Sequence, residues 1–241
     1  VSVLADLGRT VEALAEGAPL ADRLEAEGDI AHISARAVQL RLLAERGTPD
    51  EAPAPERLAA AARSVGLPFL MAEALARAAQ LLLAQRRTEQ ARTLLHELEQ
   101  LDTAAGALSW DSSLGLQSVV RVALGLDDLA LARRLAAGIQ PIAPLHEHAL
   151  ATVQAQLAEA AGDHPSAARL HHEAAERWRA FGNVPERAYA LLGQGRCLAA
   201  LGAPEAERPL REAREFFASM GYAPALAETE ALLGEGEVAA V

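Results

Sequence analysis

Apolar residues in this chain recur at the spacing of an amphipathic α-helix, every three or four positions. In the segment 165–181 the apolar stripe is Ala167, Leu170, Ala174, Trp178 and Phe181. In the segment 204–220 it is Ala206, Leu210, Ala213, Phe217 and Met220. Each stripe falls on one face of a helix, so the pattern predicts helices that bury one side against a neighbour.

The helical segments come in pairs, and the pair recurs along the chain. A turn followed by a new helix occurs, at intervals of 37 to 40 residues, near Thr10, Asp50, Thr88, Asp127, His164 and Pro204. A fixed period in this range is typical of repeat proteins, in which a unit buries its apolar face only by stacking on its neighbours. The sequence therefore predicts an all-α fold, a right-handed α-solenoid of stacked antiparallel helix hairpins.

Turn residues set the limits of the predicted helices. Glycine follows most helix ends, and threonine, aspartate or proline opens the next helix, as capping chemistry requires. The first helices of the pairs are predicted at Asp29–Arg46, Pro68–Gln85, Ser109–Leu124, Pro144–Ala161 and Val184–Leu201. The second helices are predicted at Thr10–Glu27, Pro55–Val65, Thr88–Leu101, Asp127–Ala137, Pro165–Phe181 and Pro204–Met220. Pro19 and Pro209 fall inside two of these segments, where proline is expected to kink or break a helix.

The predicted array covers residues 1–233 as a single domain with about five full hairpins. Residues 3–8 match residues 197–202, which close a first helix, so the chain opens inside a truncated hairpin and is expected to be a fragment of a longer protein. An additional helix at Pro224–Leu233 would cap the last apolar face. The segment 234–241 carries two glutamates and no basic residue, and is predicted to be a disordered tail.

Composition narrows the function. Hydrophobic residues make up 51% of the chain but aromatics only 3%, and the abundant Ala and Leu are strong helix formers. A net charge of −11 disfavours nucleic-acid binding, which needs clustered cations. All 22 basic residues are arginine, which excludes a P-loop lysine or a Schiff-base lysine. The single cysteine excludes an internal disulfide, and no apolar run is long enough to span a membrane, so a cytoplasmic protein is expected.

The clearest repeat signature is the run AYALLGQGRCLAALG at residues 188–202, followed by Ala206, Leu210, Ala213, Phe217 and Gly221-Tyr222. This pattern, in which leucine–glycine pairs and a glycine–aromatic pair separate helical segments, resembles tetratricopeptide-like arrays over nearly the whole chain. It is also similar to the C-terminal repeats of large bacterial signalling proteins, namely class III adenylyl or guanylyl cyclases with an ATPase module and large LuxR-type transcription regulators. The resemblance implies a non-catalytic domain for protein–protein interaction. The chain departs from the standard repeat in its longer period and in its Ala and Leu at most aromatic consensus positions.

Arginine recurs in the C-terminal half of the first helices. The five positions, with glutamine at one of them, are Arg41, Arg77, Arg121, Gln156 and Arg196. In arrays of this family the first helices line the concave face, so the resemblance implies a basic strip that would bind an acidic peptide through charge-assisted hydrogen bonds. The alternative is that these arginines pair with neighbouring glutamates on a solvated surface. The lysine–asparagine clamp of the family's best-known peptide binders is excluded, because the chain has no lysine.

The sequence predicts neither a catalytic nor a metal site. His146 and His148 open one helix and His171 and His172 lie on its antiparallel partner, roughly 10 Å away along the axis. Ligand nitrogens must lie near 2 Å from one ion, so these four cannot share a metal. Cys197 sits in an apolar run with no histidine within a helical turn and is predicted to be a core residue. We therefore expect no enzyme, no cofactor and no metal.

Three functions remain open from the sequence. The first is a regulatory array that binds a protein or peptide segment, or another domain of its own parent. The second is a small-molecule sensor whose superhelix closes around an inducer, and the third is a structural or oligomerisation module. Direct contact with nucleic acid or a membrane is not expected.

Overall fold

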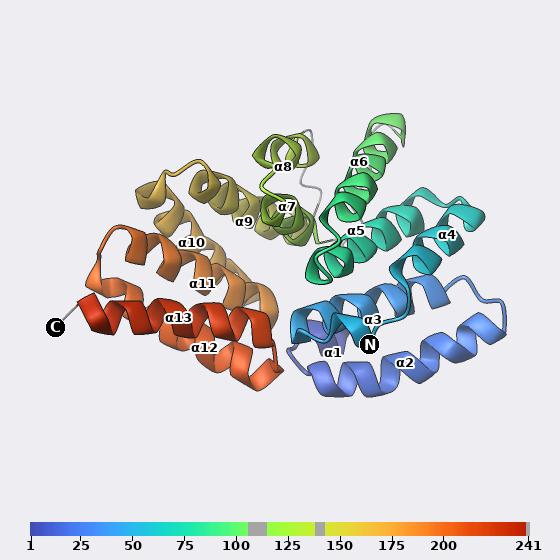
Figure 1. The fold of residues 1–241 in the computed structure, drawn as a ribbon, viewed down its shortest axis with the longest axis horizontal. Coiled ribbons are helices and arrows are strands. Elements are labelled where there is room, and N and C mark those ends of the chain that lie inside the picture. The colour runs from blue at the N-terminus through green and yellow to red at the C-terminus, as the bar shows by residue number, and fades with distance from the viewer. Residues whose placement is uncertain (106–114, 138–142, 240–241) are drawn as a thin grey trace. The chain divides into compact units, whose positions relative to one another are not determined.

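The computed structural model describes residues 1–105, 115–137 and 143–239, and all regular secondary structure in these residues is helical (Figure 1). The predicted all-α class is confirmed for this part of the chain. None of the helices described there has both the length and the apolar character needed to cross a bilayer. The chain divides into two compact units, Val1–Ala5 with Thr10–Gln140 and Asp6–Arg9 with Pro141–Val241.

The N-terminal half of the chain supplies the helices of the first unit. They are α1 (Ser2–Asp6), α2 (Thr10–Ala26), α3 (His32–Arg46), α4 (Pro55–Val65), α5 (Pro68–Ala84), α6 (Thr88–Ala105), α7 (Leu116–Gly125) and α8 (Leu129–Ala136), with a short 3-10 helix η1 at Pro49–Glu51. Helix α5 contacts its sequence neighbours α4 and α6 and also packs against α3 and α7. The helices α3, α5 and α7 therefore form one row, which we call the α3–α5–α7 row.

The second unit repeats this arrangement. Its helices are α9 (Pro144–Ala160), α10 (His164–Phe181), α11 (Val184–Ala200), α12 (Glu207–Met220) and α13 (Ala223–Ala239), with a short 3-10 helix η2 at Pro204–Ala206. Figure 1 shows these helices following one another from yellow to red, and α11 contacts α9, α10, α12 and α13. The helices α9, α11 and α13 form the α9–α11–α13 row, with α10 and α12 packed against α11. Contacts between alternate helices give each unit a repeat-like architecture.

The predicted helix limits agree with the structure where a cap or a turn fixes them. Pro55–Val65 is reproduced as α4, which ends at a left-handed Gly66 (φ 74°). Helix α8 begins two residues later than predicted because Asp128 is its N-cap, with the carboxylate accepting a hydrogen bond from the Leu131 N–H at 2.9 Å. Residues 109–114 of the predicted helix Ser109–Leu124 lie outside the described residues, and the rest of that segment corresponds to α7.

The prolines and the C-terminal segment differ from the prediction. Helix α2 continues through Pro19 without a break. The predicted helix Pro204–Met220 is divided into η2 and α12, which places Pro209 in the first turn of α12, where a missing N–H removes no helical hydrogen bond. Helix α13 runs to Ala239 and so includes residues 234–239, which the sequence assigned to a disordered tail.

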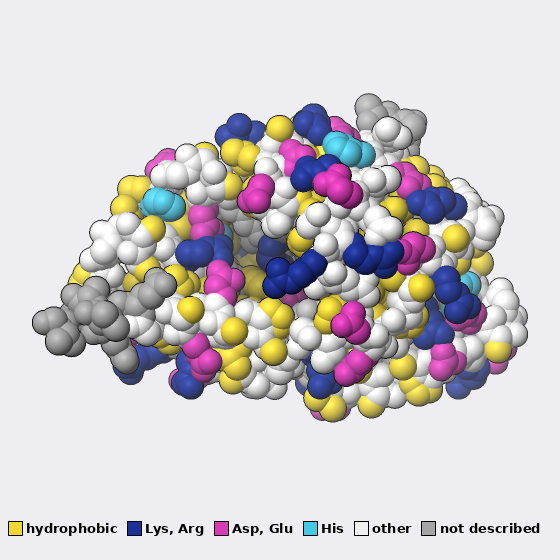
Figure 2. Space-filling view, viewed as in Figure 1, with side chains coloured by type: hydrophobic (Ala, Val, Ile, Leu, Met, Phe, Trp, Pro, Cys, Tyr) yellow, Lys and Arg dark blue, Asp and Glu magenta, His cyan; other side chains and the backbone are white. Residues whose placement is uncertain are grey.

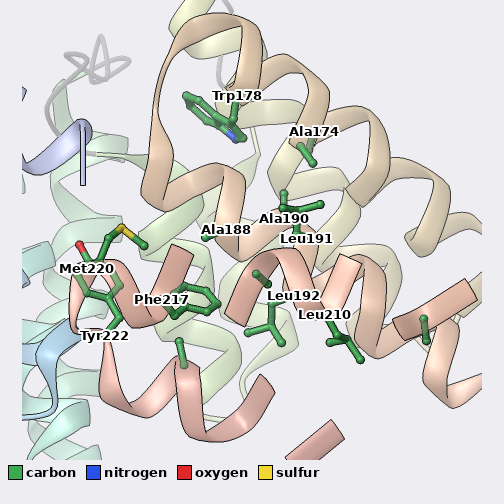
Figure 3. Close-up of a cluster of buried hydrophobic side chains, with 14 residues drawn as sticks. Ala174, Trp178, Ala188, Ala190, Leu191, Leu192, Leu210, Phe217, Met220 and Tyr222 are labelled. Carbon is green, nitrogen blue, oxygen red and sulfur yellow. The ribbon is translucent and has the colours of Figure 1, made fainter. Parts of the chain in front are cut away.

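The core of the second unit lies between α10, α11, α12 and the start of α13 (Figure 3). Trp178, Phe217 and Tyr222 are its largest side chains, and each is at most 1% exposed. The Trp178 indole N–H donates to Thr152 Oγ1 at 2.7 Å, so its polar atom is satisfied inside the core. Burying three aromatic side chains at once gives this unit a well-packed centre that fixes α11 against both neighbours.

Candidate functional site

The five residues singled out from the sequence are distributed over both helix rows. Arg41, Arg77 and Arg121 lie on α3, α5 and α7 of the first unit, and Gln156 and Arg196 lie on α9 and α11 of the second. Each row therefore carries its own part of the predicted strip.

In the first unit, polar side chains link the three helices of the α3–α5–α7 row. Arg77 is only 5% exposed, and its Nη1 donates to Ser118 Oγ on α7 at 2.6 Å and to Gln80 Oε1 at 3.3 Å. Gln80 Nε2 in turn donates to Glu45 Oε1 on α3 at 2.6 Å. Arg77 thus serves as a buried connector between helices, while Arg41 and Arg121 are partly buried.

In the second unit, five polar side chains from four helices meet around Glu159, and we call them the Glu159 cluster. Its members are Glu159 on α9, His171 on α10, Arg196 and Cys197 on α11, and Glu228 on α13. Arg196 donates through Nε and Nη2 to the two oxygens of Glu159, with Nη2 at 3.0 Å from Oε2, and through Nη1 to Glu228. His171 Nε2 lies 2.9 Å from Glu159 Oε2.

The Glu159 cluster has a buried end and an exposed end. Cys197 is 0% and His171 2% exposed, and the Glu159 side chain is 14% exposed. The side chains of Arg196 and Glu228 are 42% and 45% exposed. Only the Arg196–Glu228 side of the cluster is therefore open to solvent.

The charges of the cluster stabilise one another. Burial acts to raise the pKa of Glu159, but the hydrogen bonds from His171 and Arg196 and the positive charge of Arg196 outweigh it and lower the pKa to about 2. Burial acts to lower the pKa of Arg196, but its pairing with Glu159 and Glu228 raises it. Burial, together with the Glu159 carboxylate, raises the pKa of the Cys197 thiol to about 12. At neutral pH the cluster thus contains an ionised Glu159, a charged Arg196 and a protonated thiol.

Gly193 makes room for the histidine of the cluster. A Cβ at this position of α11 would lie 2.4 Å from Cε1 and 2.6 Å from Nε2 of His171, closer than real atoms approach. The imidazole therefore lies directly against the α11 backbone. Gln156, one turn before Glu159 on α9, is 8% exposed, and its Oε1 has no hydrogen-bond partner among the described residues.

The sequence interpretation missed the grouping of Glu159, His171 and Cys197. It compared His171 with the other histidines, whereas His148 packs instead against Trp178 and Phe181, with ring centroids 5.5 and 5.3 Å apart. Cys197 is buried beside Ala167 and Ala168 as predicted, and burial raises the pKa of its thiol. The spacing of residues along one helix cannot reveal the cluster, because its residues come from different helices.

Ion pairing is widespread on this chain, and Figure 2 shows arginine and acidic side chains next to one another over the visible face. Bidentate contacts such as that of Arg63 with Glu97 connect helices of the first unit, here α4 and α6. Arg196 likewise has two glutamate partners. For Arg196, the alternative considered from the sequence, pairing with neighbouring glutamates, describes the observed contacts.

Comparisons with known proteins define the class of fold and no more. No protein-family model matches the chain, and no curated protein matches it. Among solved structures, the crystal structure of BtubC (BKLC) from P. vanneervenii is similar, with a TM-score of 0.52 and 14% sequence identity. The similarity covers 91% of this chain and 92% of that chain. At this level of identity the likeness concerns the fold, which belongs to the class of all-helical, repeat-like folds.

Proposed function

We propose that this chain is a non-catalytic protein-interaction domain of the tetratricopeptide-like kind, in which the helix pairs of each unit stack in a right-handed sense. Its ligand is an acidic segment of a partner protein or of another domain of its own parent, a bacterial signalling or transcription regulator. The contacts between alternate helices, the 37–40-residue period and the fold similarity support the repeat assignment. Repeat proteins use such extended rows of helices as binding surfaces.

One observation carries the choice of ligand. Arg196 is held on one side by the mostly buried Glu159 and pairs on the other side with the half-exposed Glu228. The buried carboxylate fixes the guanidinium in place, while the outer carboxylate occupies the position that an acidic ligand would take. Arg196 is thus a positioned cation with one exchangeable partner.

The energies permit this exchange. An exposed ion pair such as Arg196–Glu228 contributes about 0.2–1 kcal/mol, so its loss is a small cost. A ligand carboxylate shielded from water by the bound peptide gains about 1.5–3 kcal/mol from the same guanidinium. Exchange is therefore favourable only for a ligand that covers the site, which suits a peptide or protein segment more than a free carboxylate.

The structure changes the role proposed for Arg77. Its guanidinium is 5% exposed and bonded to Ser118 and Gln80, so we assign it to the linkage of the α3–α5–α7 row. Within the second unit, Arg196 is the leading predicted contact and Gln156 remains a second one. Arg41 and Arg121 remain predicted contacts on the row of the first unit.

The test uses a fluorescein-labelled peptide of alternating glutamate and alanine, with a glutamine–alanine peptide as control, and measures anisotropy at low ionic strength. Because the chain has a net charge of −11, saturable binding of the acidic peptide requires a local cationic site. Glu228→Gln releases Arg196 and should tighten binding by about 1.4- to 5-fold, the equivalent of 0.2–1 kcal/mol.

The matched control is Glu230→Gln on the same helix, which removes the same charge and breaks a comparably exposed pair with Arg214. It should change the affinity less than Glu228→Gln does. The proposal fails if neither the wild type nor Glu228→Gln binds the acidic peptide saturably. It also fails if both variants tighten binding equally, which would reveal a net-charge effect.

A further inference from the structure

The buried end of the Glu159 cluster brings together three different kinds of metal ligand. Glu159, His171 and Cys197 come from α9, α10 and α11, and each offers one ligand atom, with all three atoms within 4.8 Å of one another. In a tetrahedral zinc site with bonds of about 2.0–2.3 Å, ligand atoms lie about 3.3–3.8 Å apart. Side-chain adjustments of about 1 Å would therefore close the three ligands around one ion.

The donor set selects the kind of ion. Thiolate sulfur and imidazole nitrogen bind Zn²⁺ and similar transition metals, whereas Ca²⁺ and Mg²⁺ require oxygen ligands. A carboxylate oxygen completes a set of three protein ligands, which leaves one tetrahedral position for water. The cluster therefore suits Zn²⁺ rather than an alkaline-earth ion.

His171 offers Nε2 as its ligand atom. Its ring is 2% exposed, and Nε2 lies 2.9 Å from Glu159 Oε2, so this nitrogen faces the other ligands. When Nε2 binds the ion, the single proton of the neutral ring is carried by Nδ1. The contact of the ring with Gly193 leaves it no free space on that side.

The charges of the cluster also accommodate a divalent ion. On binding, the Cys197 thiol loses its proton to solvent and its sulfur forms the bond to the metal. The carboxylate of Glu159 and the new thiolate then neutralise the two charges of the ion, while Arg196 keeps its pairing with Glu228. Arg196 and the metal share Glu159, so they compete for that carboxylate.

We propose that Glu159, His171 and Cys197 form a zinc-binding site that ties α9, α10 and α11 together in the second unit. This site shares Glu159 with Arg196, but its ligands do not include the exposed Arg196–Glu228 pair, and metal binding is measured without any peptide. It departs from the expectation of no metal, which considered His171 together with other histidines and not with Glu159 and Cys197.

The test is a Co²⁺ titration of the untagged chain, followed by competition with Zn²⁺. We expect a thiolate-to-cobalt charge-transfer absorption that saturates at one ion per chain, release of one proton per ion, and loss of the band when Zn²⁺ is added. Cys197→Ala should abolish the band. Loss of a residue that only supports a ligand lowers metal affinity about 10- to 100-fold, and His171→Gln, which removes a ligand, should lower it further. Arg196→Gln should tighten binding, because it removes the competing cation.

His172→Gln is the matched control, since His172 is the exposed neighbour of His171 on α10 and should leave the titration unchanged. The wild-type titration decides the matter even if a ligand variant folds poorly. Absence of the thiolate band in the wild type would show that the cluster is a structural hydrogen-bond network only. A band that survives Cys197→Ala, or one that His172→Gln weakens as much as His171→Gln does, would also overturn the proposal.

Discussion

Replacing Gly193 with alanine tests whether close packing of His171 on α11 holds the Glu159 cluster together. The new Cβ would lie 2.4 Å from Cε1, 2.6 Å from Nε2 and 2.7 Å from Nδ1 of the imidazole. The ring is buried and bonded to Glu159, so it cannot move aside without losing that hydrogen bond. Gly193→Ala should therefore destabilise the second unit.

The size of the effect follows from opposing contributions. Overpacking a buried site costs about 1–3 kcal/mol, and loss of a hydrogen bond to a charged group costs about 1.5–3 kcal/mol. Alanine is favoured over glycine inside a helix by about 0.5–1 kcal/mol, which offsets part of the loss. The expected net loss of unfolding free energy is about 1.5–5.5 kcal/mol.

Chemical denaturation monitored by circular dichroism measures this loss. Gly17→Ala on α2 is the matched control, because its Cβ would meet only the terminal Val1 side chain, at 3.0 Å, which can move. It should change stability by less than about 1 kcal/mol. In the double variant Gly193→Ala/His171→Ala the ring is absent, so adding the Gly193→Ala change to His171→Ala should cost little. If Gly193→Ala alone is as stable as Gly17→Ala, the packing argument is wrong.

The pKa of Glu159 is lowered from 4.5 to about 2, so its contribution to stability, at most about 3 kcal/mol, is full above pH 4.5 and is lost as the pH falls towards 2. The variant Glu159→Gln should therefore be less stable than the wild type at pH 7 and should lose less stability on acidification, which denaturation at pH 7 and pH 3 measures. Asn183 is the N-cap of α11, and its Oδ1 accepts a hydrogen bond from the Glu186 N–H at 3.0 Å. The variant Asn183→Ala should lower the free energy of unfolding by about 0.5–2 kcal/mol, and an unchanged melting curve would contradict this prediction. Arg121→Ala/Arg196→Ala should weaken acidic-peptide binding while retaining the helical circular dichroism signal, and unchanged affinity would remove both arginines from the proposed surface.

Sequence patterns predicted the helices well because local signals fix them. Left-handed glycines such as Gly47, Gly66 and Gly182 close helices in the structure, and the same residues marked the turns in the sequence. Apolar spacing also placed Trp178 and Phe217 in the core. These features depend on residues a few positions apart, so the sequence alone contains them.

The Glu159 cluster could not be predicted in this way. His171 follows Glu159 by 12 residues and Cys197 follows His171 by 26, and their meeting depends on how three helices are rotated against one another. The same rotations determine that Arg196 pairs with Glu228. Gly193 was a local hint, since a glycine inside a helix indicates close approach of a neighbour.

The most direct test of the proposed binding surface is the NMR signal of the Arg196 side-chain Nε–H during titration with the glutamate–alanine peptide. The signal is assigned by its loss in Arg196→Lys, and the Arg214 signal, from an exposed pair with Glu230, serves as the internal reference. The proposal predicts a saturable shift of Arg196 with the acidic peptide, none with the glutamine–alanine peptide, and little change at Arg214. An Arg196 signal that stays fixed, or shifts of equal size at both arginines, would contradict it.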